Sequence, residues 1–417
     1  MFGFLKGRLI IVRLILLAAA TALVVAGIAT IYSVGHPAES SSAAQADNLA
    51  DFWEKQAQYA AIGVLGFLTI NMVNYRRLGA ASYWIYAFVL VLLGVVLAGR
   101  FVVNISSIPE INGAHRWIRF SIKGYDLPAL QPSEFCKLAY ILALAWYLRY
   151  RSNYRSFGAL VGPFVLTVLP MVLILLEPDL GTVLLIMPVL FAMLFVAGAK
   201  VKHLFIIIIL SVAASPLMWH FMAPYQRTRI SSMLLQSGWI RQTAEQHPTI
   251  GKILVGKKFS TKQWENDWGY HLIRSKYAVA SGGMTGYGFR QGPFIKYNFL
   301  PERHNDFIFA AIAHQWGFRG CAALMVLYMI VIGCGLEIAA NNTDPFGRLL
   351  AVGIVAMFAI EIIVNVSMTL GLMPITGLTL PFVSYGGSSL LVSMISVGLL
   401  NNVGRCRPFS VAPRAFK

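Results

Sequence analysis

Long apolar runs alternate with short polar connections along most of the chain. A helix that crosses a bilayer needs about 20 apolar residues. Ten runs approach that length, near residues 9–33, 58–74, 81–99, 136–149, 159–176, 180–198, 202–222, 307–336, 346–370 and 382–403. The pattern predicts an all-α fold: a polytopic membrane protein of about ten transmembrane helices, forming a single membrane domain over residues 1–417.

The composition excludes soluble globular classes. Hydrophobic residues make up 57% of the chain and charged residues only 12%, with a mean hydropathy of +0.67. The first apolar run is much longer than the apolar region of a signal peptide, so it is expected to remain as a span. A net charge of +17 would suggest nucleic acid in a soluble protein. Here it is assigned to basic loops that set topology and contact anionic lipid, and no nucleic-acid partner is expected.

The sequence shows neither a metal-binding motif nor a disulfide framework. The four cysteines lie mostly in or beside apolar runs, and the histidines are scattered without a zinc-binding spacing. A glycine-rich stretch, residues 282–288, follows no predicted strand. It is therefore a poor dinucleotide site, and a flexible or closely packed outer segment is the better interpretation.

Lysine and arginine gather in alternate connections. One set of short connections and the chain ends contain Lys6, Arg8, Arg76, Arg77, Arg149, Arg151, Arg155, Lys200, Lys202, Arg348, Arg405, Arg407, Arg414 and Lys417. The opposite connections, residues 177–180 and 371–381, contain none. By the positive-inside rule, both termini are predicted to be cytoplasmic, in a multi-pass protein of the cytoplasmic membrane. Residues 223–305 then form one large extracytoplasmic loop.

Four polar motifs fall on the predicted outer face. They are residues 131–137, 177–182, 301–306 and 371–389, all rich in Pro, Gly or ionisable groups. Irregular polar backbone at membrane depth is tolerated only where it lines a cavity or is buried in protein. The convergence of these motifs on one face predicts a single site there.

Asp306 is the most informative residue of that site. It lies at the rim of a predicted span, and either Asn305 or Asp306 is expected to cap the helix that starts at Phe307. We expect the Asp306 carboxylate to be the catalytic base of an enzyme working on the outer face.

Each motif also has a purely structural interpretation. Asp306 could be only a helix cap, and Glu134 and Lys137 could be a local ion pair, since they are three residues apart. Glu177 could belong to a plain turn. Residues 384–389 could be a packing face for close helices, and Arg116 an anchor at the membrane interface.

The motifs together resemble the SEDS family (shape, elongation, division and sporulation), which includes the RodA and FtsW types. The resemblance runs in order from about residue 85 to 405 and rests on residues 131–137, 177–181, 225–230, 280–288, 299–307 and 381–389. Residues 371–377 are more similar to the RodA type. The resemblance implies a peptidoglycan glycosyltransferase that polymerises lipid II into glycan strands on the outer face, for cell shape, elongation or division. It also implies a class B penicillin-binding protein, a transpeptidase, as partner.

The resemblance also assigns roles to residues. The family's essential aspartate falls on Asp306, and the matching motifs provide substrate-binding candidates: Glu134, Lys137, Glu177, Arg227, Arg229, Glu302, His304 and Ser384. Arg116, outside these motifs, is a further candidate because of its positive charge. The cationic members can balance the leaving undecaprenyl diphosphate, and a divalent cation, Mg or Mn, is a candidate cofactor.

The chain departs from the family pattern at several positions. Asn305 stands where the family has Thr, His314 and Gln315 where it has two Glu, and His271 and Arg274 where it has two Gln. Residues 231–267, with Lys252, Lys257, Lys258 and Lys262, resemble an insertion.

Two alternative functions stay open. A flippase for lipid-linked precursors needs polar groups through the bilayer midplane, and Glu361 and Asn365 are the best indication of that. No internal repeat supports a transporter, however. The other alternative is a non-catalytic scaffold for a penicillin-binding protein.

Overall fold

The computed structural model describes residues 9–38, 49–101, 108–109, 115–119, 121–122, 125–126, 129–150, 157–222, 224–256, 258–267, 269–297, 299–300 and 302–405. Several residues used above lie outside these ranges: Lys6, Arg8, Arg151, Arg155, Lys257, Pro301, Arg407, Arg414 and Lys417.

Each of the ten predicted apolar runs coincides with a helix. These are α1 (Ile10–Gly35), α3 (Phe52–Met72), α4 (Tyr75–Phe101), α5 (Pro132–Leu148), α6 (Val161–Leu176), α7 (Leu180–Val196), α8 (Val201–Phe221), α15 (Ile308–Asn341), α16 (Pro345–Leu370) and α17 (Gly387–Arg405). A short 3₁₀ turn, η2 (Phe157–Leu160), leads into α6. Six of the ten are long and apolar enough to cross a membrane: α1, α4, α6 with part of η2, α15, α16 and α17. The prediction of an all-α polytopic membrane protein is confirmed.

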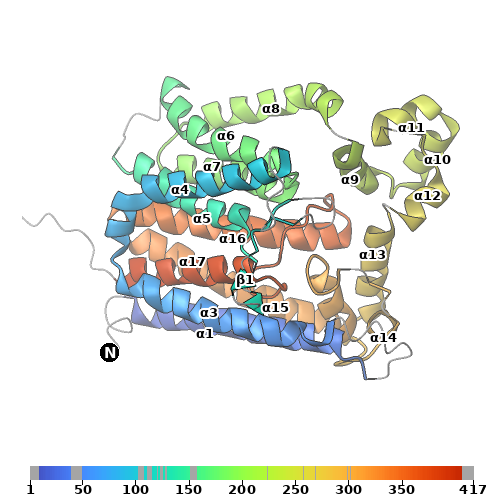
Figure 1. Cartoon of the computed structure of the whole chain (residues 1–417), viewed down its shortest axis with the longest axis horizontal. Helices are drawn as coiled ribbons and strands as arrows, with labels where there is room; N and C mark the ends of the chain where they lie inside the picture. Colours follow the sequence, from blue (N-terminus) through green and yellow to red (C-terminus); the bar gives the residue numbers. More distant parts are fainter. Residues whose placement is uncertain are drawn as a thin grey trace, which may run out of the picture.

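The long helices run back and forth between two ends of one bundle (Figure 1). We call the end with residues 177–179, 302–307 and 371–386 the loop end, and the other end, near the start of α1 and the finish of α17, the terminus end. The basic residues described at the short connections lie at the terminus end: Arg76, Arg77, Arg149, Lys200, Lys202, Arg348 and Arg405. All four polar motifs lie at the loop end.

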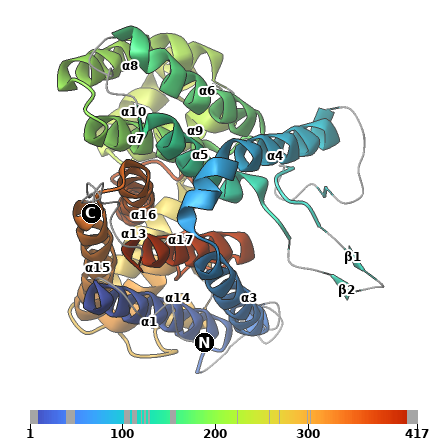
Figure 2. The same cartoon turned by 90° about the vertical axis from the view of Figure 1, so that its left-hand side faces the viewer.

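The core of the bundle surrounds α16. This helix packs against α15, α5 and α7, and Figure 2 shows it between α7 and α15. Its buried side chains include Leu350, Ile354 and Phe358. Close packing depends on small residues, since a Cβ on Gly353 would lie 2.6 Å from Ile141 Cγ2 of α5. The loops at the loop end are therefore held by a tightly packed scaffold.

The long segment between α8 and α15 is mostly helical. It contains α9 (Pro224–Leu234), α10 (Gly238–Gln246), α11 (Pro248–Val255), α12 (Thr261–Asn266), α13 (Tyr270–Gly282) and α14 (Pro293–Lys296). The expected insertion, residues 231–267, has a small core of its own, formed by Leu235, Ala244, Val255, Phe259 and Trp264. Two short antiparallel strands, β1 (Ser121–Ile122) and β2 (Tyr125–Asp126), form a hairpin between α4 and α5.

The glycine-rich segment packs into a break in α15. Gly317 leaves helical geometry there, with φ 60° and ψ −159°, a region open essentially only to glycine. Gly288 N donates to Gln315 O at 2.9 Å, and Phe318 N donates to Gly283 O at 2.8 Å. The backbone groups freed by the break are thus paired with the glycine-rich segment, which agrees with the closely packed segment expected there.

Candidate active site

Asp306 lies in a compact turn just before α15. Asn305 N and Phe307 N both donate to Glu302 O, at 3.1 and 3.3 Å. The expectation that Asn305 or Asp306 caps the helix is wrong, because the cap residue is Phe307 and it makes no side-chain cap hydrogen bond. Since residues 302–307 form their own turn, the Asp306 carboxyl is not used as a cap and is half-buried at the loop end.

Neighbouring loops fix the main chain of this turn. Asn365 Nδ2, on α16, donates to Asp306 O at 3.1 Å and to Leu378 O at 2.7 Å. Ser384 Oγ donates to Asn305 O at 2.8 Å, and Tyr385 N donates to His304 O at 2.9 Å. The segment around Asp306 is therefore tied to both α16 and the 378–385 loop.

Charges of both signs surround the Asp306 carboxyl. The pKa of Asp306 is raised to about 7, chiefly by burial; the nearby carboxylates of Glu302 and Asp179 also raise it, whereas Arg229 and Arg116 lower it. A carboxyl with a pKa near neutrality can accept a proton and release it again, as general base catalysis requires.

The turn between α6 and α7 brings Glu177 and Arg116 to the same end. Arg116 Nε donates to Glu177 O at 3.0 Å, and its Nη2 donates to Pro178 O. Asp179 caps α7 by accepting from Thr182 N and Thr182 Oγ1, at 3.3 and 2.9 Å. The Glu177 side chain is fully buried. Burial, aided by Asp179, raises the pKa of Glu177 to about 9 against the opposing effect of Arg116, so this carboxyl is neutral at pH 7.

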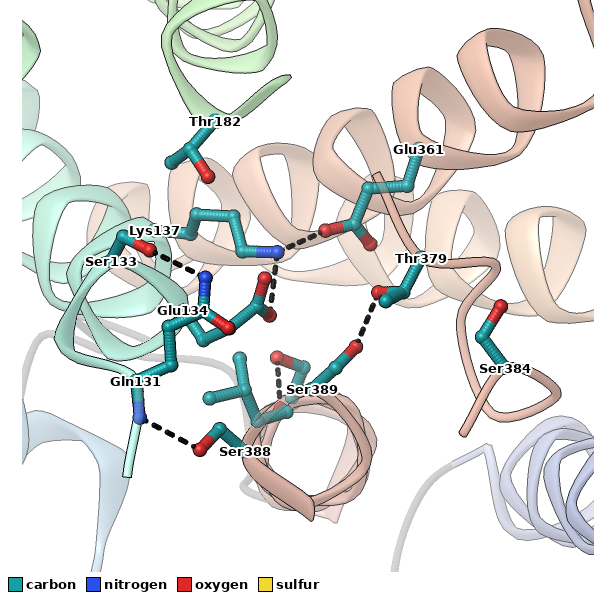
Figure 3. Close-up of polar contacts among 12 residues, drawn as sticks. Gln131, Ser133, Glu134, Lys137, Thr182, Glu361, Thr379, Ser384, Ser388 and Ser389 are labelled. Atoms are coloured by element: carbon teal, nitrogen blue, oxygen red, sulfur yellow. Dashed lines mark hydrogen bonds and ion pairs between the residues drawn. The ribbon is translucent and has the colours of Figure 1, made fainter. Parts of the chain in front are cut away.

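A buried ion cluster lies next to these loops (Figure 3). Lys137 Nζ is 2.7 Å from Glu134 Oε2 and 2.5 Å from Glu361 Oε1. The local ion pair considered for Glu134 and Lys137 is thus present, with a second carboxylate added from α16. All three side chains are buried.

The helices of this cluster also support the neighbouring loops. Ser133 Oγ, beside Glu134, donates to Asp179 Oδ2 in the turn between α6 and α7, at 3.0 Å. Glu361 and Asn365 are four residues apart on α16 and so share one helix face, and Asn365 Nδ2 donates to the Asp306 carbonyl. One face of α16 therefore carries both a member of the Lys137 cluster and a residue that holds the Asp306 turn.

The other predicted site residues lie in different places. The positive charge of Arg229 lowers the pKa of both Asp306 and His271. Arg227 instead donates from Nε to Met222 O at the end of α8, at 3.1 Å. His304 Nε2 lies 3.9 Å from Glu302 Oε2, and burial lowers the pKa of His304.

Four residues in or around the candidate site were not predicted as site residues: Asp179, His271, Glu361 and Asn365. A signal for two of them was present, because Glu361 and Asn365 are polar residues four apart in an otherwise apolar run. Burial of such groups inside a membrane helix requires partners.

Comparisons with known proteins identify the family of this chain. A family model described as "Cell cycle protein", covering FtsW, RodA and SpoVE, matches residues 13–407. Peptidoglycan glycosyltransferase RodA of Treponema pallidum is 33% identical, over 84% of this chain and 88% of that protein. Stage V sporulation protein E of Bacillus subtilis is 34% identical, over 88% of this chain and 91% of that protein.

Solved structures give the same result. A chain from a peptidoglycan synthase complex, in a structure on the coordination of polymerization and crosslinking, has a TM-score of 0.69 and 27% identity, covering 94% of this chain and 96% of that one. Rod shape determining protein RodA of Thermus thermophilus has a TM-score of 0.61 and 25% identity, covering 94% and 95%. The chain described here belongs to the FtsW, RodA and SpoVE family of multi-pass membrane proteins, the SEDS family that its motifs resemble.

Proposed function

We propose that this chain is a peptidoglycan glycosyltransferase that polymerises lipid II on the outer face of the cytoplasmic membrane. The observation that carries the proposal is the half-buried Asp306 carboxyl, whose pKa is raised to about 7, on a turn whose main chain accepts hydrogen bonds from Asn365 and Ser384. Three relatives are named peptidoglycan glycosyltransferases, from Treponema pallidum, Trichlorobacter lovleyi (a probable one) and Escherichia coli.

In this mechanism, a hydroxyl of one lipid-linked sugar attacks the anomeric carbon of another. Asp306 accepts the hydroxyl proton as the new C–O bond forms, and the bond to undecaprenyl diphosphate breaks. General base help of this kind typically contributes 10²–10⁴-fold. The positive charges of Arg116 and Arg229, which lower the pKa of Asp306, stabilise the leaving diphosphate. Asp306 then releases its proton before the next addition.

The Lys137 cluster has a supporting role in this proposal. Both of its carboxylates are close to the ammonium, so the cluster fixes α5 against α16 beneath the Asp306 turn. Glu361 and Asn365 favoured a flippase in the sequence, but both are engaged in holding the site. A transport path therefore has no support from them.

The proposed orientation places the loop end outside the cell. It rests on the basic residues at the terminus end and the positive-inside rule. A class B penicillin-binding protein is the proposed partner. It would crosslink the strands, in keeping with the structural relative that is part of a peptidoglycan synthase complex.

Mg or Mn remains a proposed cofactor. In the described part of the chain, no group of three or more His, Cys, Asp or Glu could hold a metal ion, so the proposed ion is one shared between one or two carboxylates and the phosphates of the substrate. A chelator titration of the purified enzyme tests it directly.

The test of the proposed function uses purified protein, lipid II and the partner. Wild type should polymerise lipid II, and Asp306→Asn should not, while remaining folded. The matched control is Glu337→Gln, which neutralises an exposed carboxylate at the terminus end of α15. Full polymerisation by Asp306→Asn would remove the base assignment, and flipping of lipid II without polymerisation by wild type would favour the transport alternative.

A further inference from the structure

A row of aromatic and basic side chains crosses the loop end. The Arg274 guanidinium lies 5.1 Å from the Tyr270 ring centroid and 5.3 Å from the Phe299 ring centroid. The Phe299 ring is 5.5 Å from the Tyr297 ring, and Lys296 Nζ lies 5.6 Å from the Tyr297 ring centroid. We call these five residues the aromatic row. Figure 1 shows the helices that carry or flank it, α13 and α14, beyond the ends of the long helices.

The row begins at the candidate active site. His271, next to Tyr270 on α13, stacks on Phe307 with 6.3 Å between ring centroids and 8° between planes. Phe307 directly follows Asp306. Glu302 raises the pKa of both His271 and Asp306, and Arg229 lowers both. Arg274 lies one helical turn beyond His271, about 5 Å further along α13. The row therefore leads away from the Asp306 site.

The far part of the row is open at the surface. Tyr297 is 48% exposed and Phe299 is 39% exposed, although both have ring partners on one side. Contiguous exposed aromatic groups usually mark a binding surface. The sugars of a glycan present flat C–H faces that pack against aromatic rings, and peptide stems on such a glycan carry carboxylates. Arg274 and Lys296 provide positive charge beside the rings for those carboxylates.

We propose that the aromatic row binds the growing glycan strand as it leaves the active site. The proposal rests on the polymerase function argued above. A bound product strand stays near Asp306 for the next addition, so the row acts on how long each strand grows. In this proposal the row acts on strand length and takes no part in the chemical step.

The test compares strand lengths at matched protein concentrations. The double variant Tyr297→Ala with Phe299→Ala removes the two open rings. The control is Tyr277→Ala, which removes a 61% exposed aromatic ring of α13 outside the row. Labelled lipid II is followed both as its rate of consumption and as the length of product strands. We expect the double variant to make strands shorter by about threefold or more, with consumption within about twofold of wild type.

A second arm measures binding without turnover. The ligand is a short soluble oligomer of the same glycan with its peptide stems, and the protein is Asp306→Asn in lipid nanodiscs. We expect about tenfold weaker binding, equivalent to about 1.4 kcal/mol, when the two rings are also removed. Unchanged binding and strand lengths equal to those of Tyr277→Ala would overturn the proposal, and would indicate that the row contacts lipid headgroups instead. Loss of all consumption in a folded double variant would also overturn it, by placing the row in the chemical step. A wild type that makes no polymer would contradict the proposed function, and the binding arm would then decide on the row alone.

Discussion

Removing the charge of Lys137 should destabilise the protein strongly. Its ammonium is the counter-charge for two buried carboxylates, at 2.7 Å from Glu134 and 2.5 Å from Glu361. In Lys137→Met both acids lose that partner at positions with almost no access to solvent. Breaking a buried ion pair by removing one partner typically costs about 3–5 kcal/mol. At an unfolding entropy of about 2.1 cal/mol/K per residue, a chain of 417 residues loses roughly 1 °C per kcal/mol, so the Tm should fall by about 3–6 °C.

The assay is thermal unfolding of the purified protein in one detergent, with a matched neutral variant. The triple variant Glu134→Gln, Lys137→Met and Glu361→Gln removes all three charges together. It should recover most of the lost Tm, because a neutral cluster leaves no buried charge unpaired. Glu361→Gln alone should be milder, since the Glu134 pair remains. Two results would refute this reasoning: a Lys137→Met protein with the same Tm as wild type, or a triple variant with a lower Tm than Lys137→Met.

Three further predictions concern the glycine break, the buried acid and the amide that holds Asp306. Gly317→Ala should destabilise the fold by about 3 kcal/mol or more, because glycine-only geometry is lost and the new Cβ would lie 2.6 Å from Thr285 N. Gly333→Ala, where a Cβ would meet nothing within 4 Å, is the control, and equal melting of the two would contradict the prediction. Glu177→Gln should flatten the dependence of Tm on pH. The folded state holds this proton up to about pH 9 while the unfolded acid ionises near pH 4.5, so wild-type stability falls as pH rises between those values, by up to about 1.4 kcal/mol per pH unit. A steeper fall in the variant would be inconsistent with a neutral Glu177. Asn365→Leu should lower kcat by about 10–100-fold through misplacement of the Asp306 turn, with KM for lipid II little changed, and a purely raised KM would argue against a positioning role.

The helices were predictable because their apolar runs are long enough to cross a bilayer. Boundaries were less so: the last helix begins at Gly387 rather than near residue 382, because Ser384 accepts from Leu380 N and donates to Asn305 O within a loop. The pairing of Glu134 with Lys137 followed from spacing. Its third member, Glu361, lies 224 residues away from Lys137 in sequence, and only the packing of α16 against α5 brings it there.

Local rules also gave one wrong answer at the site. Asn305 and Asp306 have the residue types of helix caps, but tertiary contacts of this turn with Asn365 and Ser384 decide its course. Spacing likewise could not separate Arg229 from Arg227, two residues apart. Arg229 lowers the pKa of Asp306, whereas Arg227 donates a hydrogen bond to Met222 O at the end of α8.

The most direct test of the central claim is the pH dependence of single-turnover glycosyl transfer from lipid II. Burial raises the pKa of Asp306 to about 7, and the base must be ionised to accept a proton. The rate should therefore fall about tenfold per pH unit below that value and level off above it, and Asp306→Asn should show little transfer at any pH. A wild-type rate that is flat from pH 5 to pH 8, or an Asp306→Asn protein that keeps the wild-type profile, would contradict the account.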